Sequence, residues 1–487
     1  MKLIFNSVEE VHNHARDAVG KTMYELNGNK NVENSKSIVG DAFEAWFGKR
    51  PDSTLGPDLA EVGVELKTTP FRKLKSGKYS AKERLVFNVI NYEDLSKETF
   101  ETSYFLYKNR LIEIGFYEYL KNISPNEWTI AEVILYEMSK NPIDYEIIKD
   151  DWETIQEYVN NGLAHELSES LTNYLSACTK GHSAKSMRTQ PFSEIRAKQR
   201  AFSFKSGYMT SLLRKYVLGD EKIESIVKNR FELINKDIET LILEHFQPYF
   251  GWSIEKLKQH FGIERDSYQT NYRIAAAILN LDGKYTETAA FQNVEEFEKA
   301  SIVLKTVKFN ENNINKESMS FPAFNFEELS QESWVNEEGE PSAEWHVFLS
   351  ETRFLFFVVK TENGQDIFKG VKFFGVPEKD LQGPIRSVWE DTVQKINEGV
   401  QLKAVKWGNG IRIENNFIAK SDNLISHVRP HETLADYSEN GRYAEKLPAA
   451  IQWINRPSGV NYSDNWMTKQ AFWLNNDYIR EQVKELL

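Results

Sequence analysis

The chain contains a weak internal duplication, and this feature constrains its fold more than any other. In the clearest echo, Trp152 and Gly162 are ten residues apart, as are Trp389 and Gly399. Three further echoes occur in the same order in both halves: Leu66-Lys67-Thr68 with Leu304-Lys305-Thr306, Phe100-Glu101-Thr102-Ser103 with Ser350-Glu351-Thr352-Arg353, and Lys198-Gln199 with Lys469-Gln470. One echo is chance, but four in order predict two copies of one fold.

The length agrees with two domains, because 487 residues exceed the size at which one hydrophobic core stops growing. The stretch 219–253 between the halves is charged and largely helical in pattern. We place the boundary near residue 230, within about 20 residues. This predicts an N-terminal domain over 1–230 and a C-terminal domain over 231–487.

Strand-like and helix-like patterns mix within each half. Runs rich in apolar and β-branched residues predict strands at 62–67, 84–91, 111–116, 130–135, 302–307, 354–360 and 368–374. Asn141-Pro142 begins a predicted helix that ends at Gly162, and Gly383-Pro384 begins its counterpart, which ends at Gly399. The fold class expected is α/β (mixed α+β), with a central sheet flanked by helices and present as two related copies.

Composition excludes several classes of protein. Cys178 is the single cysteine, which rules out an intramolecular disulfide framework and a Cys-ligated zinc finger. The apolar start of the chain is too short for a signal peptide, and no apolar run approaches membrane-spanning length. We therefore expect a soluble, cytoplasmic, globular protein.

Positive charge is concentrated in two stretches of an otherwise acidic chain. Residues 67–84 contain seven basic residues and one acid, and residues 180–215 contain nine basic residues and one acid. These stretches carry +6 and +8, so the rest of the chain must carry −26 to give the net charge of −12. Such segregation is typical of a phosphate-binding face. The alternative is a pair of solvated lysine-rich loops.

A short acidic pattern indicates a metal site in the first half. Glu65 and Lys67 lie two apart on a predicted strand and so share one face, while Leu66 turns into the core. Asp58 precedes that strand and can fold back toward them. Two converging carboxylates suit Mg²⁺, and an adjacent ammonium can orient a water, which together imply metal-assisted phosphodiester hydrolysis. By itself the pattern also fits an exposed strand with an alternating ion pair.

Two further observations favour the catalytic interpretation. Glu44 lies on the amphipathic segment 40–48, flanked by apolar residues, and is either a helix-surface residue or an acid held beside the metal. In the second half, Val303 precedes Leu304-Lys305 where the first half has Glu65. Only the first copy is therefore expected to keep a metal ligand at this position.

The chain resembles the MutH branch of the PD-(D/E)-x-K nucleases. The resemblance rests on Pro57-Asp58 followed by Gly63-Val64-Glu65-Leu66-Lys67-Thr68, on the helix with Glu44, and on Glu101-Thr102-Ser103 followed by Lys108. From about Val11 to the carboxyl terminus, the chain looks most similar to two-domain type II restriction endonucleases that cut at GATC.

This resemblance implies a restriction-endonuclease-like central sheet flanked by helices, together with an activity and a cofactor. Asp58 and Glu65 would hold Mg²⁺, Lys67 would act on the attacking water, and Lys108 would be a second active-site lysine. The activity implied is double-strand cleavage at GATC on the 5′ side of the G, blocked when the adenine is methylated. The second half would be a catalytically inactive domain that binds another copy of the site and activates the first.

The resemblance also implies DNA-contacting positions. They are Lys36, Glu83 and Lys180 in the first half, with Lys205 of the second basic stretch, and Arg429 and Pro430 in the second half. Arginine suits this role because its fork matches the major-groove edge of guanine. The partner expected is double-stranded DNA containing GATC, with no membrane. We expect a monomer in solution and leave dimerisation on DNA open.

Two other functions stay open. One is a non-catalytic, duplicated, sequence-specific DNA-binding protein in which the carboxylates only pair with lysines. The other is a MutH-like nicking endonuclease of mismatch repair.

Overall fold

The chain folds into two compact units whose segments alternate along the sequence. The computed structural model describes residues 3–32, 37–49, 55–74, 77–181, 186–219, 223–234, 236–264, 267, 269–282, 285–337, 339–408, 410–458 and 461–487. The first unit comprises residues 1–248, 265–304 and 351–354, and the second comprises 249–264, 305–350 and 355–487. No helix described here combines the length and the apolar character that a bilayer crossing requires.

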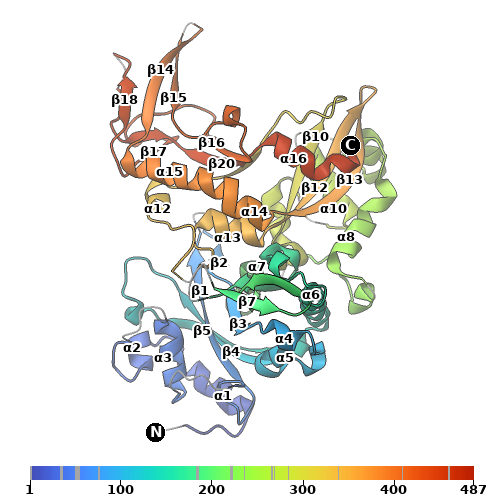
Figure 1. The fold of residues 1–487 in the computed structure, drawn as a ribbon, viewed down its shortest axis with the longest axis vertical. Coiled ribbons are helices and arrows are strands. Elements are labelled where there is room, and N and C mark those ends of the chain that lie inside the picture. The colour runs from blue at the N-terminus through green and yellow to red at the C-terminus, as the bar shows by residue number, and fades with distance from the viewer. Residues whose placement is uncertain are drawn as a thin grey trace. The chain divides into compact units, whose positions relative to one another are not determined.

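The centre of the first unit is a four-stranded sheet in the order β2-β1-β4-β5 (Figure 1). Its strands are β1 (Glu65–Lys73), β2 (Tyr79–Ala81), β4 (Leu111–Glu118) and β5 (Ile130–Glu137). Strand β1 is parallel to β4, whereas β2 and β5 are antiparallel to their neighbours. A parallel pair requires a crossover, and this one carries the helices α4 (Tyr92–Leu95) and α5 (Tyr104–Asn109). Because α5 ends just before β4, it lies at the edge of the sheet where β1 also begins.

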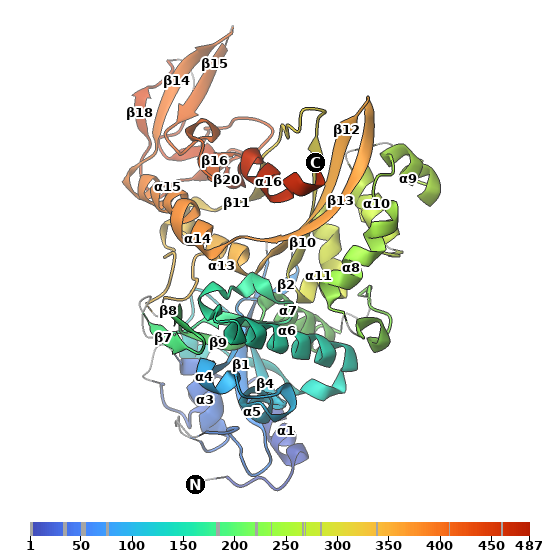
Figure 2. The ribbon, with the colours of Figure 1, turned by 45° about the vertical axis from the view of Figure 1, so that its right-hand side comes forward.

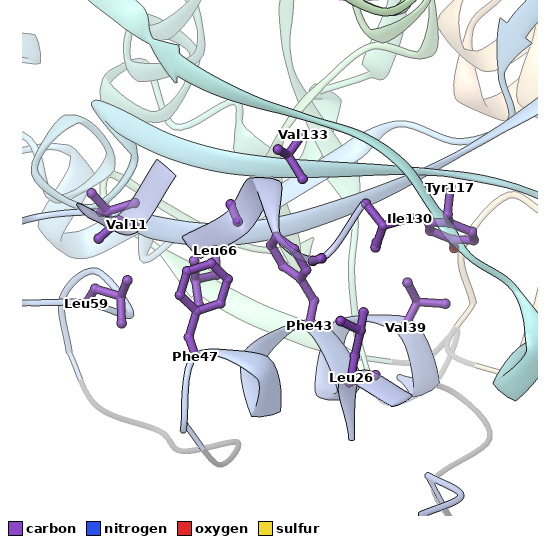
Figure 3. Close-up of a cluster of buried hydrophobic side chains, with 14 of the residues drawn as sticks. Val11, Leu26, Val39, Phe43, Phe47, Leu59, Leu66, Tyr117, Ile130 and Val133 are labelled. Atoms are coloured by element: carbon purple, nitrogen blue, oxygen red, sulfur yellow. The ribbon is translucent and has the colours of Figure 1, made fainter. Parts of the chain in front are cut away.

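An apolar cluster covers one face of this sheet (Figure 3). Val11, Phe43, Leu66 and Ile130 are all almost completely buried within it. Three helices surround it: α1 (Val8–Arg16), α2 (Met23–Leu26) and α3 (Ile38–Trp46). The burial of Leu66 in this cluster fixes the orientation of β1, so that its neighbours Glu65 and Lys67 turn to the opposite face.

A second sheet in the first unit has the order β3-β9-β6. Its strands are β3 (Leu85–Val89), β6 (Leu175–Thr179) and β9 (Arg200–Phe204), and β7 (Met187–Gln190) and β8 (Ser193–Lys198) form a separate hairpin. The helix α6 (Pro142–Asn160) precedes β6, and its N-cap is Asn141, whose side chain accepts hydrogen bonds from the N–H groups of Ile143 and Asp144. The predicted start of this helix is confirmed.

The remaining helices of the first unit are α7 (Ser206–Leu212), α8 (Ile238–Phe246), α10 (Thr270–Ile278) and α11 (Glu295–Lys299). The second half of the chain contributes α9 (Ile254–Phe261), α12 (Phe326–Ser330), α13 (Glu344–Glu351), α14 (Glu378–Asp380), α15 (Arg386–Glu398) and α16 (Asn476–Val483).

The second half contains two sheets in the orders β10-β12-β13 and β11-β20-β16. Their strands are β10 (Ile302–Phe309), β11 (Met319–Ala323), β12 (Arg353–Glu362), β13 (Gln365–Gly375), β16 (Ser426–Pro430) and β20 (Gln470–Leu474). A long ribbon of β14 (Gln401–Trp407) and β15 (Gly410–Asn415) pairs with β18 (Gln452–Asn455) (Figure 2). The short strands β17 (Ala444–Lys446) and β19 (Trp466–Thr468) form one more pair.

The order of the strands is the same in the two copies, and the predicted fold class is confirmed. The sheet β1-β4-β5 corresponds to β10-β12-β13, and β3-β9-β6 corresponds to β11-β20-β16. The outer strands of each second sheet are antiparallel to the central one. The helices α6 and α15 carry Trp152 and Trp389, both buried, at equivalent places after β5 and β13.

One echo in the sequence is not structurally equivalent. Phe100–Thr102 forms a short 3₁₀ helix ahead of α5, whereas Glu351 ends α13 and Arg353 begins β12. The resemblance of these two segments is therefore a coincidence of residue type, because they occupy different places relative to the strand that follows.

The first unit also extends beyond residue 230 through several buried polar contacts. Lys299 donates hydrogen bonds to both carboxylate oxygens of Asp144, at 2.6 and 2.9 Å, and both side chains are buried. Arg84 pairs with Glu169 and, at 3.5 Å, with Glu351. The assignment of functional domains to 1–230 and 231–487 stays a prediction, but the compact unit that contains the first copy uses segments from both ranges.

Candidate active site

A tight reversal of the chain brings Asp58 back to the start of β1. The N–H of Leu59 donates to the carbonyl of Val64 at 2.8 Å, and Gly63 between them has a φ of +72°, a left-handed conformation that favours glycine. The N–H of Asp58 then donates to Glu65 Oε2 at 3.1 Å, and the N–H of Leu66 donates to Asp58 Oδ2 at 3.0 Å. The two carboxylates therefore lie side by side, as expected from the sequence.

Two lysines meet the second carboxylate. Lys67 Nζ lies 2.8 Å from Glu65 Oε1, and Lys108 Nζ lies 3.6 Å from the same oxygen. Lys67 reaches it from the same face of β1, whereas Lys108 reaches it from α5, at the shared edge of the parallel strands. Ser103 is the N-cap of α5, and its hydroxyl accepts a hydrogen bond from the N–H of Leu106, which fixes the start of this short helix.

Glu65 is the most buried group of the cluster, with 1% of its side chain exposed. Burial raises the pKa of Glu65, and the neighbouring Lys67 opposes this shift. A carboxylate that is costly to bury stays charged when a cation is beside it. The site is thus built to hold positive charge against Glu65 and Asp58.

The donors in this cluster fit a hard divalent cation. Asp58 and Glu65 together offer carboxylate oxygens only, which is the ligand type of Mg²⁺, and this ion commonly uses one or two carboxylates from the protein. Within the described ranges there is no group of three or more His, Cys, Asp or Glu side chains arranged for a metal. A site with more protein ligands is therefore not found in that part of the chain.

Glu44 on α3 faces this cluster. Burial first, and then the nearby charge of Asp58, raise the pKa of Glu44 to about 7. Of the two interpretations that the sequence leaves open for Glu44, the position beside Asp58 agrees with an acid held near the carboxylates.

A third lysine, which the sequence patterns do not indicate, also belongs to the cluster. Lys49 Nζ lies 3.2 Å from Asp58 Oδ1, and both side chains are largely buried. Lys49 follows α3, and its N–H donates to the carbonyl of Glu44 at 3.0 Å after Gly48, which has a φ of +71°. The only signal in the sequence is a glycine that ends the helix, which does not reveal where the next side chain points.

Three of the DNA-contacting residues predicted in the first half are Lys36, Glu83 and Lys180. Lys36 lies outside the described residues. Glu83 is exposed and pairs with Lys82 at 2.8 Å, and Lys82 Nζ lies 4.5 Å from the centre of the Tyr119 ring. Lys180 follows β6, and its N–H donates to the carbonyl of Gln199. The roles of Glu83 and Lys180 stay predictions.

The position of Lys205 contradicts a role in DNA binding. Its side chain is completely buried, and Nζ donates to the carbonyl oxygens of Thr172, Glu351 and Ala300 at 2.6, 3.2 and 3.4 Å. Burial lowers the pKa of Lys205. An ammonium enclosed by three main-chain acceptors cannot reach a phosphate or a base, so Lys205 holds segments of the first unit together.

The strand β10, all of which is described, has no carboxylate at the place of Glu65 but keeps the lysine. Val303 occupies the place of Glu65 on β10, and Lys305 occupies the place of Lys67. Lys305 Nζ has a carbonyl oxygen, that of Ser320, at 3.5 Å, and burial lowers the pKa of Lys305. Elsewhere in this copy, Arg429 and Pro430 end β16 and are exposed, with the Arg429 guanidinium 4.6 Å from the centre of the Trp473 ring.

Comparison with known proteins identifies the family. The model of the DNA mismatch repair enzyme MutH matches residues 47–151. The DNA mismatch repair proteins MutH of Shewanella woodyi and Actinobacillus pleuropneumoniae are 26% and 25% identical over 187 and 188 residues, which cover 37% of this chain and 78% and 80% of theirs. The type II restriction enzyme Sau3AI of Staphylococcus aureus is 62% identical over 483 residues, which cover 98% of this chain and 99% of that enzyme. Since this similarity extends over nearly all of both chains, the protein belongs to the MutH-like type II restriction endonucleases, the family of Sau3AI.

Proposed function

We propose that the protein is a Mg²⁺-dependent endonuclease that cuts both strands of unmethylated DNA at GATC, on the 5′ side of the G. Its site of action would be the cytoplasm. The first copy carries the reaction, and the second copy binds another GATC site and activates the first.

The convergence of Asp58, Glu65, Lys67 and Lys108 supports the catalytic part of this proposal. Glu65 Oε1 lies within 2.8 and 3.6 Å of two ammonium groups, and its other oxygen accepts the N–H of Asp58. An exposed strand with an incidental ion pair would not bury Glu65 or bring Lys108 to it from a separate helix. The arrangement therefore favours a reactive site over the non-catalytic alternative.

Each residue has a distinct role in the proposed reaction. Asp58 and Glu65 would hold Mg²⁺, which when bound supplies a Lewis acid for the phosphate and favours ionisation of a water. Lys67, on the face of β1 shared with Glu65, orients the attacking water. Lys108 adds positive charge where negative charge builds up on the phosphate in the transition state. Glu44, with a pKa of about 7, can exchange a proton with a nearby water at neutral pH.

The proposed effector role of the second copy is supported by what that copy lacks and what it exposes. With Val303 in place of Glu65, β10 offers no carboxylate at the equivalent position. Arg429 and Pro430 are exposed at the end of β16, so they are accessible to DNA. Methylation of the adenine in GATC is expected to block cutting.

Incubation with plasmids tests the proposal in one gel. With Mg²⁺, a supercoiled plasmid that contains unmethylated GATC sites should become linear fragments, and EDTA or adenine methylation should prevent this. Replacing Glu65 by Ala should lower cutting by at least about a thousandfold while DNA binding is kept, because one metal ligand is lost.

Two results would contradict the proposal. Open-circular plasmid as the final product would favour the nicking alternative, and DNA binding without any cleavage in Mg²⁺ would favour the non-catalytic one. A Glu65→Ala variant that cuts at the normal rate would remove Glu65 from the site.

A further inference from the structure

We propose that Lys49 is an exchangeable counter-ion of the active site. In the free protein its ammonium neutralises Asp58, and it moves to a DNA phosphate when a divalent cation binds. This inference rests on the proposed function, because it takes Asp58 to be a metal ligand, and it adds a residue to which the motif gives no role.

The four carboxylate oxygens of the cluster have two kinds of partner. Asp58 Oδ2 and Glu65 Oε2 accept main-chain N–H groups, from Leu66 and from Asp58 itself. These donors are fixed by β1 and by the chain reversal before it. Asp58 Oδ1 and Glu65 Oε1 instead face ammonium groups: Lys49 on the first, and Lys67 and Lys108 on the second.

Only the ammonium partners can leave to admit a metal. A lysine has a flexible stem with four methylene groups, whereas a main-chain N–H cannot move without disrupting the strand. A cation held by Asp58 and Glu65 would therefore compete with these ammonium groups wherever it used Oδ1 or Oε1. At Asp58 Oδ1, the group that it displaces is Lys49.

The charge of the cluster explains why this exchange would involve DNA. Two carboxylates and three lysines, with Glu44 left aside, carry a net charge of +1, and a divalent cation would raise this to +3. Unscreened like charges at such distances are unfavourable in a largely buried site. A DNA phosphate would offset part of this excess positive charge and give the released Lys49 a new partner. Metal and DNA should therefore bind cooperatively through Lys49.

Lys49 differs from the other two lysines in a way that suits this role. Lys67 and Lys108 both contact Glu65, from β1 and α5, and so remain beside the reacting groups. Lys49 follows the end of α3 and pairs with Oδ1 of Asp58, and its charge also acts on Glu44. Its side chain is 15% exposed, which leaves a path to solvent or to DNA.

The test is a calorimetric titration of the full-length protein with Ca²⁺, first without DNA and then with a GATC duplex. Replacing Lys49 by Met keeps the length of the stem and removes the charge. The free variant should bind Ca²⁺ about tenfold more tightly than the wild type, because a competing cation is gone, a difference of about 1.4 kcal/mol. DNA should increase the Ca²⁺ affinity of the wild type, and in the Lys49→Met variant this increase should be smaller by a similar factor.

The direction of this change separates the proposal from structural damage, since a distorted site would bind Ca²⁺ more weakly. Lys49→Arg should behave like the wild type because it restores a cation, and Lys97→Met, which removes an exposed lysine, should change neither affinity. Unchanged or weaker Ca²⁺ binding by free Lys49→Met would overturn the inference.

The same titration tells the two proposals apart. If the wild type binds Ca²⁺ and Glu65→Ala does not, the metal site stands and the Lys49 variants decide the inference alone. If the wild type shows no Ca²⁺ binding that depends on Glu65, both the proposed metal site and the inference fail.

Discussion

The strands β1 and β10 carry the same Leu-Lys-Thr triplet in different chemical surroundings. In β1, Lys67 is 2.8 Å from Glu65, which in turn contacts Asp58 and Lys108. In β10, the residue two before Lys305 is Val303, and burial lowers the pKa of Lys305 without an opposing carboxylate. The strand order around both triplets is the same. A fold can thus be kept in two copies while one difference, Val303 in place of Glu65, leaves the second lysine without a carboxylate on its own strand.

The copies also differ by an insertion. The ribbon of β14 and β15 comes between α15 and β16, whereas no strand lies between α6 and β6 in the described residues of the first copy. Trp407 near the tip is exposed, and the Arg412 guanidinium lies 4.3 Å from the centre of its ring. The second copy has therefore both lost a carboxylate and gained a projecting ribbon.

The largest difference between the two copies should appear when each lysine is removed in turn. Lys67→Met should lower the single-turnover rate of GATC cleavage by about 10²- to 10⁴-fold, because the water loses its orienting cation. Lys305→Met should leave the rate within about twofold, since β10 holds no carboxylate beside it. Equal losses in the two variants, or normal cutting by Lys67→Met, would contradict the assignment of catalysis to the first copy.

A second test concerns the contacts that the first unit makes beyond residue 230. A fragment of residues 1–230 lacks Lys299, the buried partner of Asp144, and Glu351, a buried partner of Arg84. Removing one partner of a buried ion pair costs about 3–5 kcal/mol, so the fragment should have a much lower thermal midpoint than the whole chain.

Weak cleavage by this fragment would therefore reflect misfolding as well as a lost effector. Arg429→Ala in the whole chain is the matched variant, because it removes an exposed side chain of the second copy and leaves the buried pairs intact. A 1–230 fragment with the thermal midpoint of the whole chain would show that these contacts contribute little.

A smaller effect should appear in the stability of Lys305→Met. Because burial lowers the pKa of Lys305, the unfolded chain binds this proton more tightly than the folded chain. Between the lowered pKa and the usual value of about 10.4, the stability of the wild type should rise with pH. The variant should lose this rise and have a higher thermal midpoint at pH 7, by a few degrees. A lower midpoint at pH 7 would mean that the lysine stabilises β10.

The smallest expected effect concerns Glu44 on α3. With a pKa of about 7, Glu44 is about half protonated at pH 7, and a bound cation would favour its charged form. Binding of Ca²⁺ at pH 7 should then release up to about half a proton, seen as a dependence of the binding enthalpy on the buffer. Glu44→Gln should remove that dependence. An unchanged dependence would place the proton on another group.

The sequence predicted the parts of the site that depend on neighbouring residues. The two-residue spacing of Glu65 and Lys67 places them on one face of a strand, and the short chain between Asp58 and β1 allows only a tight reversal. The helix cap at Asn141 and the order of most repeated segments could also be predicted from the sequence, because caps and periodicity depend on residues close together in the chain. The segments around Glu101 and Glu351 were misaligned, because identical residue types do not fix a position relative to the next strand.

Contacts between residues far apart in the chain were decided by the tertiary structure alone. Lys108 reaches Glu65 because β1 and β4 are parallel and begin at the same edge of the sheet. Lys205, one of many lysines in a basic stretch, is enclosed by carbonyl groups from three distant segments. Even the contact of Lys49 with Asp58, nine residues apart, depends on how the chain folds after α3. Sequence spacing determines which face a side chain takes on its own element, but burial and pairing depend on which other elements pack against that face.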